Sequence, residues 1–159
     1  MVASFKDHRP RCLREPELTV LDLIPLDVDC TRVRVYECEC SGLAGKLRRL
    51  VLRTSRNRAV ALGNHIFLPD WCQGDIGVLA HELTHSGQFQ AWGPIRYFAR
   101  GIAAQLQYLL HQTLRIGSSP YQYQVTPGKP FESYGMEQQA QIVEDRCRAC
   151  SFDQATPSA

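Results

Sequence analysis

The sequence has little net charge and no long apolar run. Its 18 Lys and Arg residues against 16 Asp and Glu give a formal net charge of +2, too small to favour nucleic acid or a membrane as a partner. No stretch reaches the roughly 18 uninterrupted apolar residues of a membrane span. Residues 1–10 have no apolar core of a signal peptide. We therefore expect a soluble, cytoplasmic protein, with signal-peptide-independent export left open.

The seven cysteines do not favour a disulfide scaffold, because their number is odd and a signal peptide is lacking. Free, buried thiols are the preferred interpretation. The alternative is a four-thiolate zinc site that joins the C-x-C pair, Cys38 and Cys40, to the C-x-x-C pair, Cys147 and Cys150. C-x-C is a poorer zinc knuckle than C-x-x-C, so this alternative is disfavoured.

The composition is that of an ordinary globular domain, with 159 residues of which 44% are hydrophobic and 21% charged. We find no internal repeat and no long linker, so residues 1–159 are expected to form one domain. Its ends, residues 1–16 and 151–159, are expected to be an irregular segment and a loose tail.

The periodicity of apolar residues predicts an α+β fold. Strands are expected at 18–24 and 31–38, the second half-buried, and at 58–62 and 65–68, joined by a turn at Gly63-Asn64. Helices are expected at about 43–53, 75–92, from Pro94 to about 117, and 134–147, with a loop at 120–131.

Two of these helices have an apolar stripe that is expected to face the core. In the helix at 43–53 the stripe is Leu43, Leu47, Leu50 and Val51, although a strand through residues 50–52 is a rival interpretation. In the long helix it is Ile95, Phe98, Ala99, Ile102, Leu106, Leu109 and Leu110. The basic residues near the first stripe predict a solvated face, with an anion-binding patch as the alternative: Arg48, Arg49, Arg53, Arg56 and Arg58.

The pattern that carries chemistry is His81-Glu82-Leu83-Thr84-His85, an H-E-x-x-H motif. Two helical residues four apart are separated by about 40° around the axis and about 6 Å along it, so both imidazoles can bind one metal ion. Zinc with a neighbouring glutamate as general base hydrolyses amide bonds in this arrangement. Asp75 is a plausible N-cap for the helix.

A hydrolytic zinc site takes three protein ligands and leaves one position open. Candidates for the third ligand are His111, Glu132, Glu137, Glu144 and Asp145. Glu137 is preferred, because a ligand on a helix packed against the motif is held firmly. Glu144 or Asp145 would then orient a histidine through its other ring nitrogen.

Glu82 is the expected general base, which takes a proton from water and delivers it to the leaving amine. Tyr134 is the preferred donor to the developing oxyanion, with Tyr121 and Tyr123 as alternatives. His65 and His111 are not expected to be ligands.

Together these residues resemble the zincin metallopeptidases, in particular the gluzincin-like group whose third ligand is a glutamate. The similar region covers about residues 43–146: the segment 59–68, the motif with Gln88 and Gln90, and Glu137-Gln-Gln-Ala140. It is similar to small bacterial zincin-like domains that accompany secretion-system spike proteins and contractile injection systems.

The resemblance implies zinc and a peptide or protein substrate, with a secretion-system protein as a possible partner. It implies a backing helix, a small twisted sheet, the motif helix and a third-ligand helix. Substrate would lie antiparallel along an edge strand at 65–68. The chain departs from the larger gluzincins at Gln141, where they have Asp, and it lacks the third histidine of metzincins.

Two alternative functions stay open from the sequence. One is a catalytically silent zincin-fold module that binds a partner, and the other is a cysteine-zinc structural protein with an accidental H-E-x-x-H.

Overall fold

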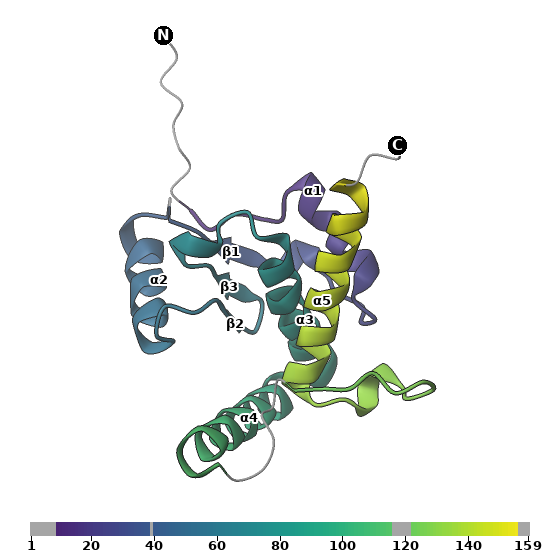
Figure 1. The fold of residues 1–159 in the computed structure, drawn as a ribbon. Helices are drawn as coiled ribbons and strands as arrows, with labels where there is room; N and C mark the ends of the chain where they lie inside the picture. The colour runs from purple at the N-terminus through teal and green to yellow at the C-terminus, as the bar shows by residue number, and fades with distance from the viewer. Residues whose placement is uncertain (1–8, 39, 116–121, 156–159) are drawn as a thin grey trace.

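The protein is an α+β molecule, mostly helical, with a small mixed sheet (Figure 1). The computed structural model describes residues 9–38, 40–115 and 122–155. The helices and strands are α1 (Glu15–Leu18), β1 (Arg34–Tyr36), α2 (Gly42–Thr54), β2 (Val60–Leu62), β3 (His65–Phe67), α3 (Ile76–Trp92), α4 (Pro94–Leu114) and α5 (Met136–Ala155). Short 3-10 turns lie at Thr19–Leu23, Cys30–Arg32, Asp70–Cys72 and Phe131–Ser133. The predicted α+β class is confirmed.

The sheet has the strand order β1-β3-β2, with β3 parallel to β1 and antiparallel to β2. The predicted hairpin is confirmed. Gly63 has φ 66°, the positive value that the first central residue of a type II′ turn requires. The expectation that residues 65–68 form an edge strand is wrong, because β1 pairs with the far side of β3 and leaves β1 and β2 as the edges.

Both faces of the sheet are covered. Val35 and Ile66 pack into the core that α3 and α5 share, whereas Tyr36 and Phe67 pack against α2. Figure 1 shows α2 on one side of the strands and α3 with α5 on the other. The expected half-buried strand at 31–38 is therefore a fully covered strand, and its regular part is only Arg34–Tyr36. The helix expected at 43–53 is confirmed as α2, which covers one face of the sheet.

Residues 18–24 are not a strand, as the sequence suggested, but the end of α1 followed by a 3-10 turn. Val20 and Ile24, four residues apart, are both buried in the main core. One side of a helical turn buries such a pair without needing a neighbouring strand. The expected loose tail is also corrected in part, because α5 continues to residue 155; residues 156–159 lie outside the described residues.

The side of α2 that faces the core is not the one predicted from its leucines. Three leucines of the predicted stripe are 42–84% exposed: Leu43, Leu47 and Leu50. Of the predicted stripe only Val51 is buried, and it shares the buried side with Leu52 and Arg48. The guanidinium of Arg48 can be buried because it donates to the Leu68 carbonyl at 3.0 and 2.6 Å and to Asp70 at 2.6 Å.

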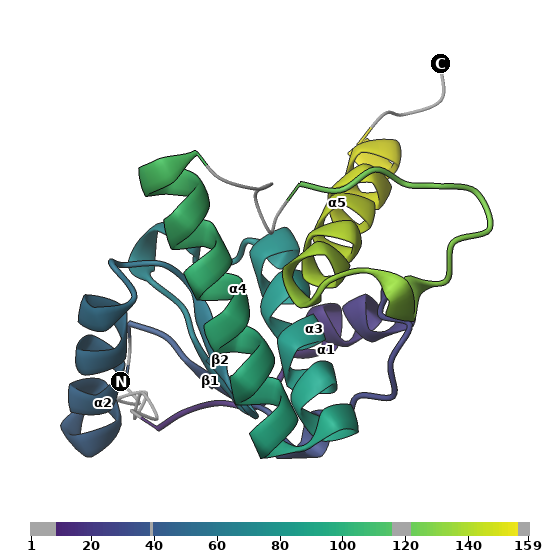
Figure 2. The same ribbon diagram turned by 90° about the horizontal axis from the view of Figure 1, so that it is seen from below.

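The helix α4 is not the core helix that its apolar stripe predicted. It touches the rest of the protein mainly through its first turns, where Tyr97 is buried and packs edge-on against Phe89 with ring centroids 5.4 Å apart. Ile95 and Ile102 are 88% and 70% exposed. Figures 1 and 2 show α4 lying past the β2 edge of the sheet. Within the described chain, no helix is both long and apolar enough to cross a membrane.

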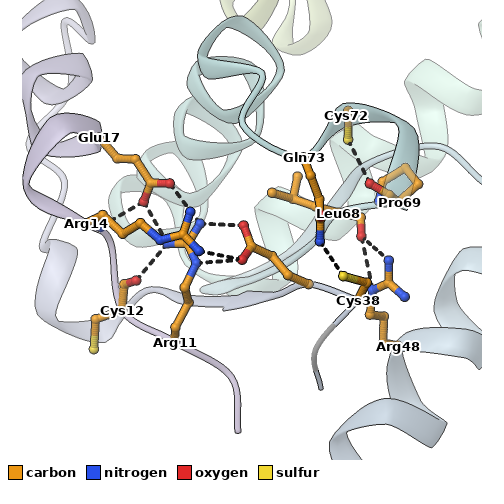
Figure 3. A network of polar contacts seen from close by, with 11 residues as sticks. Arg11, Cys12, Arg14, Glu17, Cys38, Arg48, Leu68, Pro69, Cys72 and Gln73 are labelled. Carbon is orange, nitrogen blue, oxygen red and sulfur yellow. Dashed lines mark hydrogen bonds and ion pairs between the residues drawn. The ribbon is translucent and has the colours of Figure 1, made fainter. Parts of the chain in front are cut away.

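The N-terminal segment is tied to the sheet rather than wholly irregular. Arg11 forms an isolated antiparallel bridge with Val35. Its guanidinium also binds the carboxylates of Glu17 and Glu37 at 2.6–2.9 Å, and Figure 3 shows Arg11 reaching Glu17 of α1. These ion pairs join α1 to the end of β1. They hold the N-terminal segment against the sheet. Residues 1–8 lie outside the described residues.

Candidate metal centre

The motif lies on α3, as predicted. The N-cap is confirmed: Asp75 accepts a hydrogen bond from the backbone N–H of Val78 at 3.0 Å. Leu79 and Leu83 are buried in the main core. Burial of these leucines turns the side that carries the two histidines towards α5, which lies along α3 in Figure 1.

His81 and His85 meet Glu137 of α5. The Oε2 atom of Glu137 is 3.7 Å from Nε2 of His81 and 3.5 Å from Nε2 of His85. The three ligand atoms all lie within 4.8 Å of one another. Ligand atoms about 2.0–2.2 Å from a tetrahedral zinc ion are about 3.3–3.6 Å from each other. The residues that the sequence predicted as ligands thus have separations that suit one zinc ion.

The other ring nitrogen of each histidine is held by a buried or half-buried acceptor. Nδ1 of His81 lies 3.1 Å from Oε2 of Glu144, and Nδ1 of His85 lies 2.8 Å from Oε1 of Gln88. A carboxylate or amide oxygen can only accept, so each Nδ1 carries the proton. In the neutral rings this leaves the Nε2 lone pairs free to face Glu137, as metal ligation needs.

A chain of ion pairs fixes Glu144 in turn. Arg148 donates to Glu144 at 2.8 Å and to Asp75 at 3.2 Å. Asp75 also caps α3. The Arg148 guanidinium therefore links the first turn of the motif helix to Glu144, the partner of His81. The sequence left Glu144 and Asp145 as alternatives for this role; Asp145 instead accepts from the Tyr123 hydroxyl.

The electrostatics of the cluster match a site for a cation. Burial opposes the charged form of His81, but hydrogen bonds to Glu137 and Glu144 outweigh it and raise its pKa to about 10. Burial likewise opposes ionisation of Glu137, yet the two histidines hold its pKa well below the usual range. The protein therefore keeps a buried carboxylate charged beside two imidazoles, which in the absence of metal requires protons on the rings.

Glu82 lies beside this cluster and is only 5% exposed. Burial raises the pKa of its carboxyl, against the opposing effect of His81 and His85. Its Oε2 is the single buried side-chain oxygen or nitrogen without a hydrogen-bond partner in the described part of the chain. Buried carboxylate oxygens are rarely left unpaired, so this oxygen suits a water or substrate group at the site.

Tyr134 does not face the cluster through its hydroxyl. That hydroxyl accepts from the Thr126 N–H at 3.1 Å and donates to the Gln124 carbonyl at 3.4 Å, while Lys129 lies 4.0 Å above the ring. These contacts favour a role in holding the loop at 122–130. Of the two alternative tyrosines, Tyr123 binds Asp145 as described above, and Tyr121 lies outside the described residues.

Sequence reasoning gave no role to three residues that the structure places at or near the candidate site. Gln88 orients His85 and also donates to Gln139 of α5 at 2.9 Å; its position three residues after His85 was the available signal. Arg148 was missed because only the docking of α5 brings it to Asp75. Tyr97 donates to the Ala61 carbonyl at 2.8 Å. Burial, with the nearby charges of Glu82 and Glu137, raises its pKa.

The remaining candidates lie outside the group formed by His81, His85 and Glu137. Glu132 is exposed in the turn before α5, and His65 pairs with the Tyr36 hydroxyl at 3.1 Å. In the described part of the chain, His81, His85 and Glu137 are the sole metal-competent trio, so the four cysteines of the C-x-C and C-x-x-C pairs are not gathered into a site. All seven cysteines are free of disulfides.

Comparison with protein-family models, with curated proteins and with solved structures finds no significant match to this chain.

Proposed function

We propose that the protein is a zinc-dependent peptidase. The observation that carries this proposal is the convergence of two Nε2 atoms and one carboxylate oxygen at 3.5–3.7 Å, beside the unpartnered buried oxygen of Glu82. Two histidines and one glutamate are a ligand set of hydrolytic zinc enzymes, which keep a fourth position for water.

A zinc ion held by His81, His85 and Glu137 would supply Lewis-acid activation of water and of the scissile carbonyl. Glu82 would accept a proton from the attacking water and return it to the leaving amine. A pKa raised by burial suits both transfers, because it moves the carboxylate closer to the operating pH than an exposed glutamate. Glu144 and Gln88 would keep both imidazoles in the ligating tautomer and orientation.

The zincin resemblance is part of the same proposal. The resemblance implies a helix behind a small sheet, a motif helix and a third-ligand helix. In this proposal α2, the sheet, α3 and α5 would take those parts. The structure favours less the implied alignment of a peptide substrate along the sheet edge, because carbonyls at one edge already accept hydrogen bonds. Of the two edge strands, β2 has carbonyls at or next to it that are already occupied: Ala61 accepts from Tyr97 at 2.8 Å and Gly63 accepts from Ser86 at 3.0 Å.

This occupied edge favours one alternative, a catalytically silent zinc-binding module. Glu82, His85 and Glu137 are each less than 9% exposed, and a closed centre of this kind is also suited to stabilising the fold. In that case zinc would bind with the same ligands, but no peptide would be hydrolysed.

Metal analysis tests the site itself. The wild-type protein should hold one zinc ion, which His81→Ala should lose and Cys147→Ser should retain. If Cys147→Ser lost zinc and His81→Ala kept it, zinc would be bound by the cysteines and not by the histidines.

Hydrolysis of a peptide library then separates the two functions. Cleavage should be abolished in Glu82→Ala with zinc still bound, and kept in Glu132→Ala, which removes an exposed glutamate outside the cluster. Zinc binding without cleavage by the wild-type protein would support the silent module, and equal cleavage by wild type and Glu82→Ala would refute the role of Glu82.

A further inference from the structure

A cationic pocket lies on α2, which covers the opposite face of the sheet from α3 and α5 (Figure 1). Its volume is about 430 Å³, within the range of small-molecule sites. It is lined by Arg48, Arg49, Leu52, Arg53, Arg56, Asn57 and Asp70. Four guanidinium groups therefore meet one carboxylate at this place, in a protein with a net charge of only +2.

Arg48 is a fixed, buried donor at this pocket, with only 8% of the residue exposed. Nε and one terminal nitrogen bind the Leu68 carbonyl, and the same terminal nitrogen binds Asp70; Figure 3 shows the contact with Leu68. The second terminal nitrogen, Nη1, has no hydrogen bond to any residue that the structure describes. A guanidinium held by its neighbours in this way loses little freedom when it binds a ligand.

The other three arginines are not paired with an acidic residue within the described chain. Arg49, Arg53 and Arg56 are exposed, and none of them has an ion pair or hydrogen bond to a described residue. Arg49 and Arg53 are four apart on α2, a spacing at which like charges repel and destabilise a helix. Arg56 follows the helix with φ 56°, a left-handed conformation that is uncommon for a residue other than glycine. The repulsion among these charges is unfavourable to the folded protein, and an anionic ligand would reduce it.

We propose that the pocket binds a compact soluble ligand with adjacent phosphoryl groups, such as an inorganic or organic di- or triphosphate. Guanidinium groups match phosphoryl oxygens bidentately. Three positive charges without an ion pair to any described residue, around a volume larger than one phosphate group, favour a multivalent anion over a single carboxylate. Leu52 supplies an apolar contact for an organic substituent. This site is separate from the metal centre and does not depend on the proposed peptidase function.

Calorimetric titration with inorganic triphosphate and pyrophosphate at low salt tests the proposal. Zinc-loaded and metal-free protein are titrated in parallel, since polyphosphates also bind divalent metals. We expect one binding site in both forms, with affinity that falls as salt rises. The double variant Arg49→Gln with Arg53→Gln should bind at least about tenfold more weakly, because it removes two charge-assisted contacts.

The matched control is Arg96→Gln with Arg146→Gln, which removes the same charge from exposed positions on α4 and α5. Its affinity should stay within about twofold of wild type, as distant surface charges are screened. Equal weakening in both double variants would overturn the proposal in favour of a net-charge effect. Binding confined to zinc-loaded protein would overturn it in favour of metal chelation.

Lipid headgroups carry the same phosphoryl chemistry, so vesicles with and without a polyphosphorylated inositol lipid form a second arm. Soluble triphosphate that binds with the expected loss in the Arg49/Arg53 variant supports the pocket. Sedimentation with the vesicles but no binding of soluble triphosphate or pyrophosphate would overturn it.

Discussion

Nδ1 of His81 and Oε2 of Glu144 lie 3.1 Å apart, although 63 positions separate the two residues in the chain. The contact joins the motif helix to α5, the same helix that carries Glu137. The packing of α3 against α5 therefore supplies both Glu137, the proposed third ligand, and the group that orients His81, the proposed first ligand.

Glu144→Gln should weaken zinc binding by about 10–100-fold, because the carboxylate that orients His81 and increases its basicity is replaced by a neutral amide. Competition with a chelator of known affinity measures this change. Asp145→Asn is the matched control: its carboxylate binds Tyr123 and Gln141 rather than a histidine. The same loss of affinity in both variants would contradict a specific role for Glu144.

Gln88→Leu should lower the free energy of unfolding of metal-free protein by about 2–4 kcal/mol, because leucine leaves buried partners of the amide unsatisfied. Those partners are Nδ1 of His85, the Met136 carbonyl and the Gln139 amide oxygen. Zinc affinity should fall as well, and urea unfolding with and without zinc measures both effects. Gln105→Leu, at an exposed position of α4, should change neither by much.

Two helical glycines should respond to alanine with opposite signs. A Cβ on Gly45 would lie 2.5 Å from the backbone carbonyl oxygen of Cys40, whereas a Cβ on Gly101 would meet no atom within 4 Å. Gly101→Ala should stabilise the protein by up to about 1 kcal/mol through helix propensity. Gly45→Ala should destabilise it, since the collision with backbone outweighs the same gain. Thermal unfolding of both variants measures the difference, and stabilisation by Gly45→Ala would refute the close approach.

Stability should decrease in acid partly through Glu37. The hydrogen bond from Arg11 lowers the pKa of Glu37 below its ordinary value of 4.5, against the effect of burial. A lowered pKa in the folded state means that the contribution is complete above about pH 4.5 and is lost as pH falls through the folded-state pKa. Glu37→Gln should cost about 2 kcal/mol at pH 7, and its difference from wild type should shrink below pH 4.5. Urea unfolding at several pH values tests this, with the exposed Glu132→Gln expected to follow wild type throughout.

The parts of the fold that the sequence predicted well are those whose signals are local. The motif helix has an N-cap at Asp75, and the hairpin has a glycine with positive φ at Gly63. In both cases the hydrogen bond or backbone conformation that defines the element is formed by residues adjacent in the chain. The sequence pattern therefore does not depend on distant packing.

The predictions that failed were those that depended on which surface an element meets. Arg48 is buried on α2 while Leu43 stays 84% exposed, because the Leu68 carbonyl and Asp70 provide partners for the guanidinium. The apolar stripe of α4 predicted burial, but only its first turns reach Phe89 and Ala61. A periodic apolar stripe indicates that a helix has an apolar side, but it does not predict which element covers that side.

The sequence by itself determined that two imidazoles and a glutamate lie together on one helix, because residues one and four apart on α3 have fixed relative positions. Only the tertiary structure decided which carboxylate joins them. The packing of α5 against α3 brings the Glu137 carboxylate to the two histidines and makes Glu144 rather than Asp145 the partner of His81. The tertiary structure also decided which strands form the sheet edges, since the pairing of β1 with β3 joins segments far apart in the chain. Such contacts depend on the burial of whole surfaces, which short sequence patterns do not specify.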